Sequence, residues 1–171
     1  MKRLYLLRHT KSSWDEPGLA DRDRPLAPRG RKAAKRIAAY LRDEDAAPAV
    51  VLCSSSVRTR QTLAAILTAL DGEPEVLVED GLYAAGADTL LARIRAVPSA
   101  AGSVLLIGHN PGIGDLAFSL AGGGDADALA RLGEGFPTGA LATFTVDADA
   151  WDGLAAGGAE LAAYVVPREL P

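Results

Sequence analysis

The chain has 171 residues, a length that suits one domain with a substantial buried core. Hydrophobic residues make up 49% of the sequence, yet no apolar run approaches the roughly 20 residues that span a bilayer. The net charge of −4 argues against broad binding to nucleic acids or anionic membranes, which depends on a basic surface. Cys53 is the only cysteine and cannot form an internal disulfide, so a reducing, cytoplasmic location is expected.

The first third of the chain alternates short apolar runs with helical periodicity. Lys2–Leu7 has the length and composition of a strand, and a polar loop follows it. Pro28 suits the first position of a helix, and apolar residues then recur at helical spacing as far as Leu41. Ala49–Cys53 predicts a second strand, and Ser54–Ser56 supplies candidate N-caps for the helix after it.

The middle of the chain repeats this alternation. Apolar residues at helical spacing over Leu63–Leu70 predict a second helix, which Asp71-Gly72 ends. Glu75–Val78 is a strand candidate, and the stripe within Leu90–Val97 predicts another helix. Ser103–Ile107 is the clearest strand, because its unbroken hydrophobicity is typical of a parallel strand buried on both faces.

The last third predicts one more helix and two strands. The helix covers Ile113–Leu120 and ends at Gly122–Gly124. The strands are Ala140–Val146 and Leu161–Val166, the second at an edge of the sheet before Pro167. This order predicts an α/β three-layer sandwich with a mainly parallel central sheet and helices on both faces. No repeat or linker divides the chain, so one domain over residues 1–171 is expected.

Residues with suitable chemistry follow the predicted strands. Ligands of such folds bind beyond the carboxyl ends of the strands, and both histidines of the chain, His9 and His109, stand directly after strands. Arg8 precedes the first histidine, and Arg58 follows the second strand. Each of these residues alone would be an ordinary surface or turn residue. Together, two imidazoles and two guanidinium groups suit the oxygens of a phosphoryl group.

Four segments resemble motifs of the histidine phosphatase superfamily, which includes phosphoglycerate mutases and histidine acid phosphatases. Leu7-Arg8-His9-Thr10 is similar to the first Arg-His motif of the family, and Ser54–Thr62 to its second arginine motif. Gly108–Gly112 is similar to the second histidine motif. The loop Asp23-Arg24-Pro25-Leu26 resembles that of the SixA-type phosphohistidine phosphatases. Order and spacing agree over most of the chain.

The resemblance implies a phosphoglycerate mutase-like fold and a role for each matched residue. His9 is then the nucleophile that forms a transient phosphohistidine. Arg8, Arg58 and a protonated His109 hold the phosphoryl oxygens. Arg24 is a further phosphate contact or, as the alternative, a solvated loop arginine that pairs with Asp21 or Asp23. The scattered carboxylates and two histidines show no metal-ligand spacing, so neither a metal nor another cofactor is expected.

One departure from the wider family bears on the substrate. Many members place a glutamate after the third strand to protonate a leaving alcohol, and Ala84 stands at that position here. Glu79, Asp80 and Asp88 are nearby substitutes, but none matches the position. A leaving imidazole, with a pKa of about 6.5, needs a general acid less than an alkoxide does.

The missing acid favours a phosphoramidate substrate over an alkyl phosphate ester. The short connections favour a site open to a histidine presented on another protein. The expected activity is a SixA-type protein phosphohistidine phosphatase, with a histidine phosphotransfer domain as a candidate partner. A small-molecule phosphomonoesterase of the same superfamily and a catalytically silent phosphate-binding module remain alternatives.

Two further chemistries fit the sequence less well. A cysteine phosphatase places five residues between its cysteine and arginine, whereas Cys53 and Arg58 enclose four. A nucleotide-binding loop at Gly108–Gly114 would lack the Lys-Ser/Thr pair of a P-loop.

Overall fold

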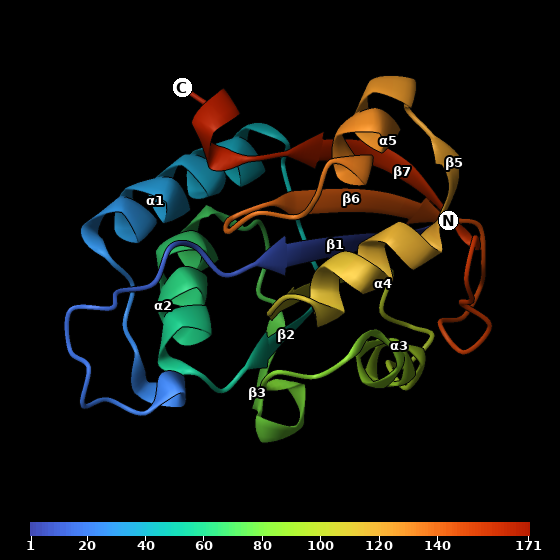
Figure 1. The fold of residues 1–171 in the computed structure, drawn as a ribbon. Helices are drawn as coiled ribbons and strands as arrows, with labels where there is room; N and C mark the ends of the chain where they lie inside the picture. The colour runs from blue at the N-terminus through green and yellow to red at the C-terminus, as the bar shows by residue number, and fades with distance from the viewer.

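A computed structural model describes residues 1–171 and contains one seven-stranded sheet (Figure 1). Along the sheet the strand order is β3-β2-β4-β1-β6-β7-β5. The strands are β1 (Lys2–Arg8), β2 (Val50–Ser54), β3 (Glu75–Glu79), β4 (Ser103–Gly108), β5 (Ala121–Gly124), β6 (Leu141–Val146) and β7 (Ala159–Val165).

The sheet is mainly parallel, as the sequence predicts. Strands β3, β2, β4 and β1 pair in parallel, and β5 is parallel to β7. Strand β6 is antiparallel to both of its neighbours, β1 and β7, so it alone runs in the opposite direction.

Helices cover both faces of the sheet, which makes the molecule a three-layer sandwich (Figure 1). Helices α1 (Pro28–Asp43) and α2 (Val57–Ile66) lie on one face. Helices α3 (Ala87–Arg95), α4 (Gly112–Leu120) and α5 (Ala126–Gly133) lie on the other. None of the helices is both long enough and apolar enough to cross a membrane.

Alternate residues of the central strands supply the two cores. In β1, Leu4 and Leu6 pack into the cluster under α3, α4 and α5. Tyr5 and Leu7 pack into the cluster under α1 and α2. Because side chains alternate across a strand, a strand buried on both faces must be apolar throughout, which is the pattern in the sequence.

The C-terminal edge of the sheet differs from the expectation. Gly122–Gly124 belongs to strand β5, which pairs with β7, so β7 is not an edge strand. A Cβ added at Gly122 would lie 2.1 Å from the carbonyl oxygen of Gly157, so only glycine fits this close approach. Glycines have no side chains to alternate across a strand. The sequence pattern at Gly122–Gly124 therefore predicted the end of a helix and not a strand.

Helix α5 is the second element with no counterpart among those predicted from the sequence. Its N-cap, Asp125, accepts a hydrogen bond from the backbone N–H of Ala128 at 2.8 Å. Ala128 and Leu132 point into the core. A capping aspartate before this short stripe was the available signal.

The topology brings the residues after β1, β2 and β4 to one edge. These three strands are parallel neighbours, and Arg8 at the end of β1 pairs in register with Gly108 at the end of β4. The backbone N–H of His9 donates to the Gly108 carbonyl at 3.1 Å. The two histidine motifs, about a hundred residues apart in sequence, therefore meet at this edge.

Candidate active site

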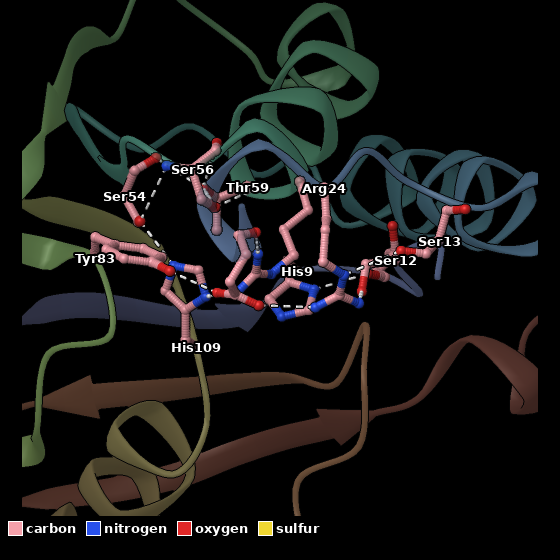
Figure 2. A network of polar contacts seen from close by, with 12 residues as sticks. His9, Ser12, Ser13, Arg24, Ser54, Ser56, Thr59, Tyr83 and His109 are labelled. Atoms are coloured by element: carbon pink, nitrogen blue, oxygen red, sulfur yellow. Dashed lines mark hydrogen bonds and ion pairs between the residues drawn. The ribbon is translucent and has the colours of Figure 1, made fainter. Parts of the chain in front are cut away.

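The predicted site residues gather beyond the carboxyl ends of β1, β2 and β4. The ring centroids of His9 and His109 are 5.3 Å apart, and Tyr83 packs edge-on against His109 (Figure 2). His9, His109 and Arg58 are buried, with 6%, 4% and 7% of their surfaces exposed. The structure thus brings together side chains from three separate motifs.

The ring of His9 is fixed by the residue that follows it. Its Nδ1 lies 2.7 Å from the Thr10 carbonyl oxygen. A carbonyl can only accept, so Nδ1 carries the proton and Nε2 keeps its lone pair. Burial, together with the nearby His109 and the positive charges of Arg58 and Arg8, lowers the pKa of His9 to about 3 despite that hydrogen bond. His9 is therefore a neutral imidazole near pH 7.

His109 has the opposite tautomer. Arg58 Nη2 lies 3.4 Å from its Nδ1, and a guanidinium can only donate, so Nδ1 accepts. The proton is then on Nε2, which donates to Ser54 Oγ at 2.7 Å. Burial and the charge of Arg58 lower the pKa of His109 to about 4, although the Asp21 carboxylate opposes the shift.

Asp21 links three groups of the site, a role that the sequence pattern does not predict. Its carboxylate accepts from Arg58 Nη2 at 3.0 Å, from Arg24 Nη1 at 2.9 Å and from the Tyr83 hydroxyl at 2.5 Å. These donors, Tyr83 foremost, hold the pKa of Asp21 well below its usual range. Its partners lie 3, 37 and 62 residues away, so the only sequence signal was its spacing from Arg24.

Arg24 lies in the site rather than in solvent. Its side chain donates from Nε to the Ser13 carbonyl at 3.0 Å and from Nη2 to Ser12 Oγ at 2.5 Å (Figure 2). The ring of Trp14 covers it, with Cζ 3.3 Å from the ring centroid. Arg24 does pair with Asp21, but it is 93% buried and is not a solvated loop residue.

Arg8 is half-buried beside the two histidines. Its Nη1 donates to the Phe136 carbonyl at 3.1 Å, while its Nε is buried and has no partner within the protein. Burial and the neighbouring Arg58 lower the pKa of Arg8. This guanidinium therefore keeps a positive charge close to both histidines.

Threonine side chains join the first two motifs. The backbone N–H of Thr10 donates to Thr62 Oγ1 at 3.2 Å, and that hydroxyl donates to the Arg58 carbonyl at 2.8 Å. Ser56 is the N-cap of α2 and accepts from the Thr59 N–H at 3.3 Å. The segment after β1 is thereby held against the first turns of α2, which carry Arg58.

The carboxylates considered as proton donors lie outside this cluster. Glu79 pairs with Arg93 at 2.7 Å, and Asp80 pairs with Arg22 at the surface. Asp88 is exposed in the first turn of α3. None of the three forms a hydrogen bond with His9 or His109, and Ala84, at the position of the family's acid, is exposed with a φ of 52°.

Cys53 is a core residue and has no place in the site. It is fully buried in the cluster under α1 and α2, and its Sγ donates to the Ser54 carbonyl at 3.3 Å. Burial raises the pKa of this thiol to about 12, so it is not a thiolate near pH 7. No group of three or more His, Cys, Asp or Glu side chains is placed to hold a metal ion.

Known proteins resemble this chain in sequence and in structure. The family model of the histidine phosphatase superfamily, branch 1, matches residues 4–83. An uncharacterized protein of Mycobacterium tuberculosis is 38% identical over 164 residues, which cover 95% of this chain and all of that protein.

Two solved structures match over nearly the whole chain, and both proteins are provisionally named phosphohistidine phosphatase SixA. The protein from Nakamurella multipartitia is 35% identical with a TM-score of 0.84, covering 97% of this chain and 96% of its own. The protein from Agrobacterium tumefaciens is 34% identical with a TM-score of 0.81, covering 97% and 98%.

Proposed function

This chain belongs to the histidine phosphatase superfamily, in its SixA-type branch, and we propose that it hydrolyses protein phosphohistidine through a phosphohistidine intermediate on His9. The observation that carries the proposal is the hydrogen bond from His9 Nδ1 to the Thr10 carbonyl. This hydrogen bond leaves Nε2 of His9 unprotonated, close to the positive charges of Arg58 and Arg8. The provisional names of the two similar structures support the substrate class.

The first step forms a bond between His9 Nε2 and phosphorus and breaks the bond from phosphorus to the substrate imidazole, which leaves as neutral imidazole because solvent has protonated its other ring nitrogen. Neutral imidazole attacks without a base to deprotonate it, and the low pKa of His9 keeps it neutral. Water then attacks phosphorus and breaks the bond to Nε2, which releases inorganic phosphate and restores His9. Both displacements depend mainly on positioning and charge stabilisation.

The surrounding donors supply that stabilisation. The N–H groups of Arg58 and Arg24 already converge on one anion, the Asp21 carboxylate, which indicates that they can bind phosphoryl oxygens in the same way. Arg8 adds a positive charge close to both histidines. His109 lies against Arg58, and a bound phosphoryl dianion would raise the pKa of His109 and favour its protonated form, with two donors.

The lack of a poised acid favours phosphohistidine over phosphate esters. Asp21 is held ionised by its three donors, and the hydrogen bond to Asp21 raises the pKa of Tyr83. Neither group is suited to protonate an alkoxide in the transition state. Because general acid catalysis contributes roughly 10²–10⁴-fold, an alcohol leaving group is at a disadvantage that an imidazole largely avoids.

Trapping of the phosphoenzyme tests the nucleophile. We expect a labelled phosphoramidate to yield an acid-labile, base-stable adduct in the wild type and none in His9→Ala. Cys53→Ala is the matched control and should retain the adduct, because Cys53 lies in the core. An acid-stable adduct, or one that survives in His9→Ala, would contradict the mechanism.

A pair of peptides tests the substrate class. One carries phosphohistidine and the other phosphoserine in the same sequence, and kcat/KM is measured for both. We expect the phosphohistidine peptide to be favoured by about 100-fold or more, the advantage of needing no general acid. Equal values would keep the phosphatase assignment but remove the preference for phosphohistidine.

A further inference from the structure

A groove lined by cations lies beside the end of β1. It has a volume of about 390 Å³ and is bounded by α1, by the segment before β6 and by the C-terminal turn Pro167–Glu169. Figure 1 shows that turn close to α1 at the C-terminal end of the chain. The basic residues of the lining are Lys11, Arg29, Lys32, Arg36 and Arg168.

These five cations have no acidic partner. All five are exposed, and none forms an ion pair, although six ion pairs occur elsewhere in the molecule. No carboxylate lines the groove, and nearby Glu169 is engaged by Arg131 at 2.5 Å. In a chain with a net charge of −4, this is a local concentration of unpaired positive charge.

The local structure of α1 does not favour this arrangement. Arg29 stands in the first turn, where the helix dipole favours acidic side chains, and that turn contains no acidic residue. Lys32 follows Arg29 at i+3 and precedes Arg36 at i+4, spacings at which like charges repel. Helix stability therefore gives no reason for these cations, whereas a bound anionic partner does.

The groove and the nucleophile share a stretch of backbone. Lys11 is two residues after His9, so their Cα atoms are at most about 7 Å apart. On the other side of the groove, Thr138 is followed by Gly139, whose N–H donates to the His9 carbonyl at 3.0 Å. A polypeptide seated in the groove would thus reach the site within a few residues.

We propose that this groove docks an acidic surface of the phosphorylated protein whose phosphohistidine reaches His9. The assignment rests on the proposed function and names the surface of the substrate that is recognised. A protein fits better than a small anion, because every cation is exposed and no buried polar side chain lines the groove to fix a small ligand. Exposed charges act chiefly by steering association, an effect that salt screens.

Two matched double variants test the groove. Lys32→Ala/Arg36→Ala removes two groove cations, and Lys35→Ala/Arg42→Ala removes one Lys and one Arg that are exposed on the same helix outside the groove. None of these four residues forms an ion pair, so the two variants differ in position and not in charge.

The kinetic probe is a phosphohistidine peptide flanked by glutamates, compared with one flanked by glutamines. In low salt we expect the wild type to favour the acidic peptide by about tenfold in kcat/KM, at the lower end of electrostatic steering. The groove variant should lose most of that preference, and the control variant should keep it. About 1 M salt should abolish the preference for the acidic peptide in the wild type and in both variants. Turnover of the neutral peptide should be the same in all three.

A binding measurement separates this inference from the proposed function. The probe is a dye-labelled acidic peptide with unphosphorylated histidine, followed by fluorescence anisotropy, and it needs no chemistry. Weaker binding to the groove variant alone would support the docking surface even if no phosphohistidine were hydrolysed. Equal binding of the peptide by both variants would overturn the docking surface and leave the proposed phosphatase activity unaffected. If the same cations bound a single-stranded oligonucleotide more tightly than the acidic peptide, the docking surface would also be overturned.

Discussion

At the scale of single residues, Asp21 is the unexpected member of the site. Its carboxylate offsets the charges of the buried Arg24 and Arg58, and Arg58 lies close to Arg8 and to both histidines. Without a counter-charge, neighbouring guanidinium groups at low dielectric would destabilise one another. Asp21 therefore has two opposing effects on the site: it orders the guanidinium groups, and it competes with an incoming anion for their N–H donors.

Asp21→Asn separates those effects. Removing the negative charge makes the site more positive, so we expect inorganic phosphate to bind about five- to tenfold more tightly, or roughly 1 kcal/mol. Isothermal titration calorimetry measures the change. Asp23→Asn is the control, because Asp23 is exposed in the same turn and forms no ion pair. Weaker phosphate binding would mean that ordering of Arg24 and Arg58 is the dominant role.

The two histidines should have different tautomers. We expect long-range ¹H–¹⁵N spectra near pH 7 to show His9 protonated on Nδ1 and His109 on Nε2, as their partners require. The chain has no other histidine, so the spectra carry only these signals. Because the pKa values are lowered to about 3 and about 4, neither ring should titrate between about pH 5 and pH 8. An inflection near pH 6.5 would contradict this electrostatic picture.

At the scale of elements, the packing of α1 positions the segment that follows the nucleophile. The Lys11 carbonyl accepts from the Ala27 N–H at 2.9 Å, just before α1 begins. Gly30 in the first turn lies directly against the same residue, and a Cβ there would be 2.0 Å from the Lys11 oxygen. The start of α1 thus fixes the backbone two residues beyond His9.

Gly30→Ala should damage both stability and activity. The added Cβ meets backbone and not a flexible side chain, so the segment after β1 must shift, at a cost of about 1–3 kcal/mol. We expect a lower Tm and a lower kcat toward a phosphoramidate. In the control Gly133→Ala, near the end of α5, the added Cβ has no atom within 4 Å, so Tm and kcat should change little. Unchanged kcat in Gly30→Ala would show that the His9 segment does not depend on this contact.

At the scale of the whole molecule, two neutral buried histidines tie the stability of the fold to pH. Their pKa values are lowered in the folded state, so the unfolded chain binds more protons between about pH 4 and the ordinary value of about 6.5. Stability from this source is fully present above that value, and it is lost progressively as the pH falls from there until it has passed through the folded pKa values.

Urea unfolding at two pH values tests the linkage. About pH 5 lies 1.5 units below the unfolded pKa, so each histidine should lower the free energy of unfolding by roughly 2 kcal/mol relative to pH 7. In His9→Asn the pH-dependent loss should be about half as large, since only His109 still titrates. If the wild type and His9→Asn lost the same free energy of unfolding, groups other than His9 would control stability between about pH 5 and pH 7.

The sequence by itself determined the elements with strong local patterns and the residues that follow them. Ser103–Ile107 could be placed as a buried parallel strand because a short, unbroken apolar run is typical of a strand buried on both faces. The start of α1 at Pro28 could be placed because proline suits the first turn. Since parallel strands end at one edge, Arg8, His9, Arg58 and His109 could be expected to meet there, and they do.

Only the tertiary structure decided the features that depend on contacts between distant residues. Asp21 meets Arg58 and Tyr83 across 37 and 62 residues, distances at which sequence spacing carries no information. Strand β5 exists because glycines allow its backbone close to its neighbours, and such a strand has no side-chain pattern to detect. The groove cations likewise come from three separate segments, and only folding concentrates their charge beside His9.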